Sequence, residues 1–103
     1  MRISGLAVLS PAHLPIGERD AIESVIRSAT HRFGRAEIDY CGIAVETHRY
    51  GFFLNTAAVL EDEKPPLVSA ALWNILDQAE RQGCDWVLFD RDEPVSRDLP
   101  LPV

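Results

Sequence analysis

The sequence contains little cysteine, no long apolar run and no excess of basic charge. Its two cysteines, Cys41 and Cys84, are too few and too far apart to predict a disulfide framework or a metal site. No apolar run approaches the roughly 20 residues that a membrane-spanning helix needs, and residues 1–9 lack the pattern of a signal peptide. We therefore expect a cytoplasmic protein with no membrane segment, no metal and no cofactor.

The charge balance limits the classes of partner. The 103 residues carry a net charge of −6, whereas binding to nucleic acid or to an anionic membrane needs a basic surface. Acidic excess usually serves solubility, but some small acidic proteins bind the basic surfaces of other proteins. The composition therefore favours a protein partner and argues against direct nucleic-acid binding.

The spacing of apolar residues predicts the secondary structure. Apolar residues recur every three or four positions over 15–29 and 66–82, which predicts two helices. A loop is expected over 57–66. The last ten residues contain three prolines, so 95–103 is expected to be an extended tail. Strands are predicted over 3–9, 36–47, 50–55 and 85–90.

The resulting order, β-α-β-β-α-β, predicts one α+β domain over residues 1–103. It fits the split β-α-β (ferredoxin-like) sandwich, in which two helices pack on one face of an antiparallel sheet. The first and last strands are both apolar on both faces, although the last would be an edge strand in that fold. Either a partner chain or the tail covers that edge, or the topology differs.

The charged cluster Asp90-Arg91-Asp92 follows the last predicted strand directly. An Asp-x-Asp pair in this position resembles the start of haloacid-dehalogenase-type phosphatases, but only 11 residues follow Asp92 and no Gly-rich phosphate loop is present. We therefore interpret the cluster as a capped turn that pairs with nearby basic residues. A small hydrolase or transferase that uses Asp90, Asp92 and His13 stays open as an alternative.

The histidines show no metal-ligand spacing. A ferredoxin-like topology would place His13 near Cys84 and at the opposite end of the sheet from Asp90, so a Cys–His nucleophile pair is geometrically conceivable. No sequence signature frames such a pair. We therefore interpret His13 as a turn residue whose ring bonds a backbone group.

Two further groups of residues are candidates for protein binding. Trp73 lies off the centre of the apolar stripe of its helix, beside Asp77, and is either at the rim of the core or an exposed anchor for a partner. The predicted loop contains an acidic knot, Glu61-Asp62-Glu63, which is either solvated or directed at a basic surface. With the charged cluster, the candidate binding residues are Trp73, Asp77, Glu61, Asp62, Glu63, Asp90, Arg91 and Asp92.

Three motifs carry a family resemblance. They are Ser-x-x-His-Leu at 10–14, Tyr-Gly-Phe-Phe at 50–53, and Gly-x-Asp-Trp-x-x-Phe-Asp-Arg-Asp at 83–92, which is followed by Leu99-Pro100. Together they resemble a small, uncharacterised bacterial family (a domain-of-unknown-function group) that occurs on plasmids and integrative elements. The resemblance implies a bacterial cytoplasmic protein. Because the family has no established activity, it assigns no catalytic residues.

These observations predict a non-catalytic protein-binding module. In its more specific form it is a regulator or inhibitor that is encoded by a mobile element and acts on a host system, for example an anti-CRISPR-type anti-defence protein. The two alternatives are the small hydrolase or transferase described above and a structural homodimer that pairs edge strands.

Overall fold

The computed structural model describes residues 1, 3–32, 35–61 and 63–101. They form an α+β domain, which confirms the predicted class, with more strands than predicted and a short additional helix. In chain order the elements are β1 (Gly5–Leu9), a 3-10 turn (Pro11–His13), α1 (Ile16–Arg27), β2 (Thr30–Arg32), β3 (Arg35–Glu37), β4 (Asp39–Tyr40), β5 (Ile43–His48), β6 (Gly51–Asn55), α2 (Ala58–Glu61), α3 (Ala70–Arg81) and β7 (Cys84–Asp90).

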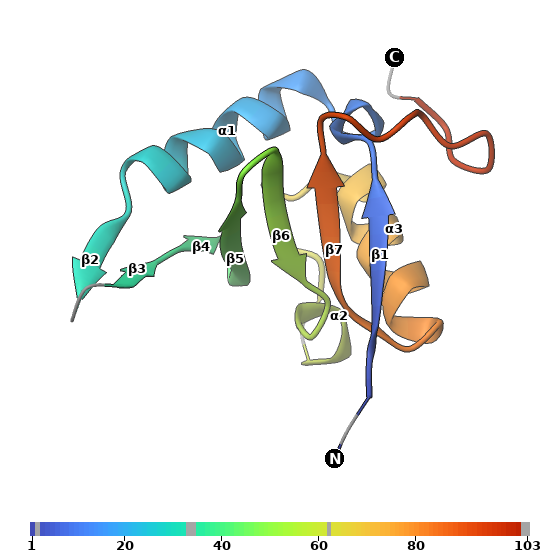
Figure 1. The fold of residues 1–103 in the computed structure, drawn as a ribbon, viewed down its shortest axis with the longest axis horizontal. Coiled ribbons are helices and arrows are strands. Elements are labelled where there is room, and N and C mark those ends of the chain that lie inside the picture. The colour runs from blue at the N-terminus through green and yellow to red at the C-terminus, as the bar shows by residue number, and fades with distance from the viewer. Residues whose placement is uncertain (2, 33–34, 62, 102–103) are drawn as a thin grey trace.

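Five of the strands form one mixed sheet in the order β1-β7-β6-β5-β4 (Figure 1). β1 and β7 are parallel, and the other neighbouring pairs in this sheet are antiparallel. The sheet therefore departs from the ferredoxin-like arrangement in two respects. It has five strands rather than four, and its first and last strands run in the same direction. β2 and β3 pair separately as a two-stranded ladder.

The last strand, β7, lies inside the sheet between β1 and β6, and not at the edge that the ferredoxin-like order assigns to it. This position explains why Val87, Leu88 and Phe89 are apolar at consecutive positions, since both faces of an interior strand contact neighbouring side chains. All three are buried. β1 is the edge strand instead, and its Leu6 and Val8 are exposed. The apolar pattern of β1 thus reflects an edge strand with one apolar face open to solvent.

The middle of the chain follows the prediction in part. β5 and β6 form the expected antiparallel hairpin, which turns at Arg49 and Tyr50. The single strand predicted over 36–47 is wrong, because the chain reverses between β4 and β5. Cys41 and Gly42 both have positive φ, 52° and 87°, a conformation that glycine adopts without steric cost. β4 therefore becomes the edge of the sheet opposite β1.

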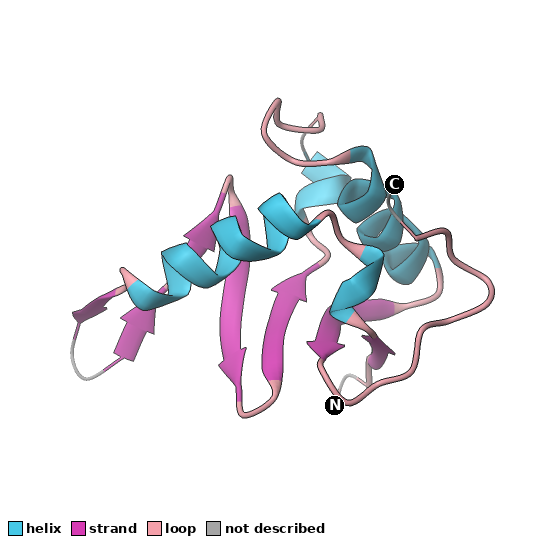
Figure 2. Cartoon of the chain, turned by 90° about the horizontal axis from the view of Figure 1, so that it is seen from above, coloured by secondary structure: helices cyan, strands magenta, loops and turns pink. Residues whose placement is uncertain are grey.

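Helices α1 and α3 cover one face of the sheet (Figure 2). α3 begins later than predicted because the Oγ of Ser69 accepts a hydrogen bond from the N–H of Leu72 (3.0 Å), which caps the helix. Gly83 follows its end at a φ of 85°. The buried stripe of α3 packs against β7 and lies in one core with apolar side chains of β5 and β6 and with Ile22 of α1. This side of the sheet is called the covered face below.

The segment between β6 and α3 is more ordered than the predicted loop. Residues 58–61 form the single turn α2, which contacts α3. The tail after β7 has neither helix nor strand over 91–101, as predicted. Among the described residues, no helix is long and apolar enough to cross a membrane.

Candidate binding surface

No described helix covers the second face of the sheet (Figure 2). Strand register places Leu6 opposite Trp86, Val8 opposite Leu88 and Phe53 opposite Leu88, so these five side chains share one face. Leu6 and Val8 remain 49% and 39% exposed. We call this side of the sheet the uncovered face.

An aromatic row crosses the uncovered face from the β5–β6 turn to β7. It consists of the rings of Tyr50, His48, Phe53 and Trp86. The centroids of Tyr50 and His48 are 6.0 Å apart, those of His48 and Phe53 are 5.3 Å apart, and those of Phe53 and Trp86 are 6.4 Å apart. Each contact is edge-to-face, a geometry that aromatic pairs favour. The row therefore gives this face a defined shape as well as apolar area.

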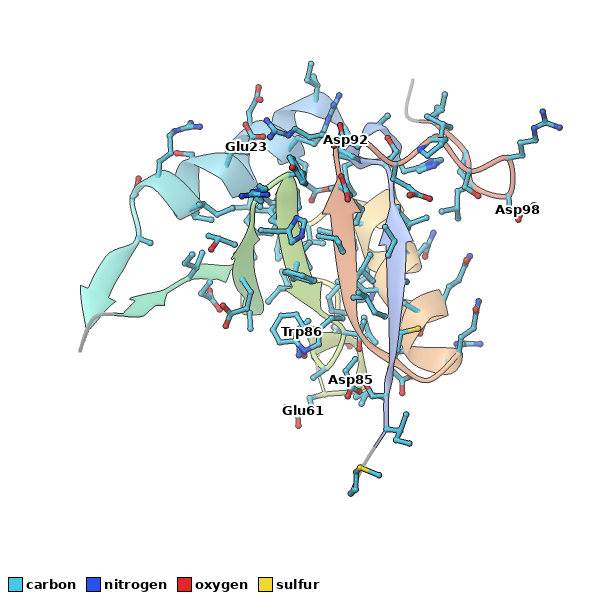
Figure 3. The ribbon with its side chains drawn as sticks, viewed as in Figure 1. Glu23, Glu61, Asp85, Trp86, Asp92 and Asp98 are labelled. Atoms are coloured by element: carbon cyan, nitrogen blue, oxygen red, sulfur yellow. The ribbon has the colours of Figure 1, made fainter. Side chains whose placement is uncertain are left out.

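A shallow groove of about 480 Å³ follows the row at the end of the face nearest the chain's first residues. Leu6, Phe53 and Trp86 supply its apolar lining and Glu46 supplies a carboxylate. Figure 3 shows Glu61 and Asp85 at the same end of the sheet as Trp86. No ion pair of Glu46 with a basic side chain occurs among the described residues. The groove is thus an apolar strip with acidic groups near it.

Trp73, one of the candidate binding residues, does not belong to this surface. It lies on α3 and packs, half-buried, against the covered core, so the structure places it at the core rim. Asp77 is one turn further along α3, where its Oδ2 is 3.0 Å from the Nε of Arg81. An i, i+4 pair on an exposed helix contributes about 0.3–0.5 kcal/mol. These two residues are therefore explained by packing and by helix stabilisation.

The acidic knot is described only in part. Glu61 ends α2 and is exposed, Glu63 is exposed in the following segment, and Asp62 lies outside the described residues. Glu61 is near the groove end of the sheet, because Thr56, two residues before α2, donates its N–H to the carbonyl of Asp85 (2.9 Å). The knot therefore adds negative charge near the groove end of the uncovered face.

The charged cluster forms a turn at the opposite end of β7. The Oδ1 of Asp90 accepts the N–H of Asp92 (2.9 Å), which confirms the predicted capped turn. The Nε of Arg91 donates to the carbonyl of Tyr50 (3.1 Å), so this arginine ties the end of β7 to the β5–β6 turn. The predicted pairing of the aspartates with basic side chains is not seen among the described residues. The cluster thus joins two turns through backbone groups.

His13 is fully buried and holds the tail. Its Nε2 accepts the N–H of Ser96 (2.9 Å), and its Nδ1 lies 3.1 Å from the carbonyl oxygen of Pro100. A neutral ring with its proton on Nδ1 satisfies both contacts. The prediction that the ring bonds backbone groups is confirmed. Both ring nitrogens are therefore engaged, and neither contacts a carboxylate.

The predicted proximity of His13 and Cys84 is wrong. Because β1 and β7 are parallel, Cys84 pairs with Gly5 at the start of both strands, whereas His13 follows their far end. The ferredoxin-like topology makes these strands antiparallel, which reverses that relation. His13 and Asp90 consequently lie at the same end of the sheet, where β1 and β7 both finish. Cys84 is at the other end, so a Cys–His pair of these two residues is excluded by geometry.

A buried polar cluster under the covered face was not foreseen from the sequence. The carboxylate of Glu18 on α1 accepts hydrogen bonds from the Tyr40 hydroxyl (3.0 Å), from the N–H of Ser69 (2.9 Å) and from the Ser69 hydroxyl. Burial, followed by the negative charge of Glu18, raises the pKa of Tyr40 above its ordinary value. Three elements distant in sequence supply the cluster, so no local pattern reveals it. Its bonds lock α1, β4 and α3 together.

No candidate metal site is present in the described part of the chain. It contains no group of three or more His, Cys, Asp or Glu side chains arranged to hold a metal ion. The structure instead defines a small α+β domain with one face packed by helices and one apolar, aromatic face left open.

The comparison with known families gives the particular assignment. Residues 6–102 match the family of unknown function DUF5983, C-terminal domain. The chain belongs to that family, which confirms the resemblance to an uncharacterised domain-of-unknown-function group. No curated protein and no solved structure matches the chain.

Proposed function

We propose that this protein is a non-catalytic protein-binding module and that it binds its partner through the uncovered face. The observation that supports this most directly is the exposure of Leu6 and Val8 beside the aromatic row. A contiguous apolar patch on a folded domain marks an interaction site more often than scattered surface residues do. Tyr and Trp also carry a large share of the binding energy at protein interfaces.

The charges around the face specify the chemistry of the partner. Glu46 lines the groove, and the chain as a whole has a net charge of −6. Single-stranded nucleic acid also stacks on aromatic rows, but it needs cationic side chains along the track of its phosphates. The partner we propose is therefore a protein with an apolar patch flanked by lysine or arginine. Opposite charges across such a contact accelerate association and select against wrong partners.

The more specific form of the proposal is a regulator or inhibitor encoded on a mobile element. A basic patch with apolar neighbours is typical of surfaces that normally hold nucleic acid. A small acidic domain that occupies such a surface blocks the partner's access to its nucleic acid. An anti-CRISPR-type anti-defence protein is one form of this activity.

The test is affinity capture from the native host with a matched pair of variants. Leu6→Lys adds a positive charge to the uncovered face, whereas Leu67→Lys adds the same charge at a residue that is 81% exposed beside the N-terminus of α3. We expect Leu6→Lys to weaken capture of the specific partner by about tenfold or more, because a lysine repels the partner's basic groups and removes apolar contact. Leu67→Lys is expected to capture the partner as the unmodified protein does.

Capture that is equal for Leu6→Lys and the unmodified protein contradicts the proposal, as does loss of capture by Leu67→Lys alone. Circular dichroism and thermal unfolding of both variants establish that each is folded. The partner is then identified by mass spectrometry, and its binding to both variants is measured with purified components.

A second copy of the chain is the alternative occupant, and one observation favours it. β1 is an edge strand with a neighbour on one side only, so its outer edge offers backbone groups to another strand. Light scattering of the purified protein decides between the two. A stable dimer that Leu6→Lys dissociates assigns the surface to self-association, and a monomer removes the homodimer.

A further inference from the structure

A pocket separate from the groove lies at the opposite end of the sheet and is lined by three arginines. It has a volume of about 230 Å³ and is bounded by α1, the β5–β6 turn and the end of β7. Its charged lining consists of Arg27, Arg49, Arg91 and Glu23. Figure 3 shows Glu23 and Asp92 at this end of the molecule. We call this site the arginine pocket.

The fold brings these side chains together from three distant parts of the sequence. Arg27 is at the end of α1, Arg49 is in the β5–β6 turn, and Arg91 follows β7. Close approach of β6 and β7 is required here, because a Cβ on Gly51 would lie 1.7 Å from the carbonyl oxygen of Phe89. Gly51 thus permits the β5–β6 turn to sit beside Arg91.

Two of the arginines are held in position. Arg91 donates from Nε to the carbonyl of Tyr50 (3.1 Å) and from Nη2 to the carbonyl of Arg49 (3.4 Å), which leaves Nη1 for another partner. The guanidinium carbon of Arg49 lies 5.7 Å from the ring centroid of Tyr50, within cation–π distance. A guanidinium that is already oriented loses less freedom when it binds a ligand.

The electrostatic balance of the pocket differs from that of the chain. Within the described residues none of the three arginines forms an ion pair, although the chain as a whole is acidic. The lining of the pocket contains three arginines, one carboxylate, that of Glu23, and the half-buried apolar side chain of Ile26. The three arginines are exposed, so solvent and salt screen their attraction for a bound anion, and we expect binding to be strongest at low ionic strength.

We propose that the arginine pocket binds a phosphate group, either as free phosphate or as part of a small phosphomonoester. Guanidinium groups that three distant parts of the chain bring to one pocket match an anion with several oxygens and up to two negative charges. The volume is below the range of pockets that enclose a whole drug-sized ligand. The phosphate therefore lies inside, and the organic part of a phosphomonoester lies outside.

The experiment is a calorimetric titration at low ionic strength with inorganic phosphate and, separately, with glycerol 3-phosphate. Arg27→Gln and Arg49→Gln are each expected to weaken binding by about tenfold, since each removes a charge-assisted contact. Arg97→Gln, which removes the same charge from the exposed tail, is expected to leave the affinity within about twofold. Glu23→Gln is expected to strengthen binding several-fold, because it removes the carboxylate that opposes the anion.

Absence of saturable binding with both ligands overturns the proposal. Equal weakening by Arg97→Gln and Arg49→Gln also overturns it, because that result reflects overall charge and not the pocket. Tighter binding of glycerol 3-phosphate than of inorganic phosphate supports the site and assigns it to a phosphomonoester, whereas equal affinities support it for the free ion. The Arg27 side chain makes no hydrogen bond or ion pair within the described structure, so its variant tests the pocket without loosening a turn.

Discussion

The two faces of the five-stranded sheet carry apolar side chains of similar kind but have different surroundings. On the covered face, Leu54, Val87 and Phe89 are fully buried beneath the two long helices. On the uncovered face, Leu6 and Val8 remain 49% and 39% exposed, next to the aromatic row. The covered face has the composition of a core, and the uncovered face has that of an interface before its partner is bound.

This difference separates residues that stabilise the fold from residues that remain to be explained by function. Burial of apolar surface contributes about 25 cal/mol per Å², so Phe89 contributes most of its available free energy in the folded chain. Leu6 and Val8 leave a large part of their apolar surface exposed to water, and that part does not stabilise the folded chain. Their presence on one face with four aromatic rings therefore favours a role in binding over a role in folding.

The largest expected effect is on the covered face. Phe89→Ala removes a fully buried ring that contacts Phe52, with ring centroids 5.5 Å apart, and leaves a cavity. We expect a loss of about 3–5 kcal/mol in the free energy of unfolding. Urea denaturation followed by circular dichroism measures it. A loss below about 1 kcal/mol would show that this face is not the core.

The second effect concerns the tail at the edge of the covered face. His13→Ala leaves the Ser96 N–H and the Pro100 carbonyl without their partner and empties a buried position. We expect a loss of about 2–3 kcal/mol in the free energy of unfolding. Limited proteolysis followed by mass spectrometry should show faster cleavage after Arg97 than in the unmodified protein. Unchanged cleavage would show that His13 does not hold the tail.

The third effect is the pH dependence of the cluster beneath the covered face. Burial and the charge of Glu18 raise the pKa of the Tyr40 hydroxyl above 10.0, the ordinary value. The folded state therefore keeps this proton more tightly than the unfolded state, and stability is complete below about pH 10 and falls above it. Tyr40→Phe should remove this alkaline loss and cost about 1 kcal/mol at neutral pH. Equal alkaline slopes for both proteins in urea denaturation at pH 9 and pH 11 would refute the assignment.

The smallest expected effect on stability is on the uncovered face. Leu6→Ser replaces a half-exposed side chain on an edge strand, so the free energy of unfolding should fall by about 1 kcal/mol or less. Thermal unfolding of Leu6→Ser and Phe89→Ala under the same conditions compares the two losses. A loss as large as that of Phe89→Ala would contradict the distinction between the two faces.

The sequence predicts the local features well and the arrangement of the strands poorly. The positions of α1, the β5–β6 hairpin and β7 follow from apolar spacing, and the turn at Asp90 and Asp92 follows from the preference of aspartate for such turns. Strand order does not follow, because a parallel or an antiparallel pairing of β1 with β7 leaves the same apolar pattern. The direction of β1 relative to β7 depends on long-range packing.

The candidate site was missed for the same reason. Trp86 and Phe53 are predictable as strand residues, but their place in one row with His48 depends on the strand order. The arginine pocket likewise combines residues from α1, a turn and the end of β7. Trp73, for which the helical spacing allows either the core rim or an exposed anchor, is part of the core rim, since α2 and the sheet lie against α3.

Photo-crosslinking in cells of the native host tests the central claim most directly. A benzophenone amino acid is placed at Val8 on the uncovered face and, in a second variant, at the exposed Gln78 on α3. The variant with the probe at Val8 is expected to crosslink to a single protein with a basic surface. The variant with the probe at Gln78 is expected not to give that product. Crosslinking of a specific partner from Gln78 and not from Val8 would contradict the account.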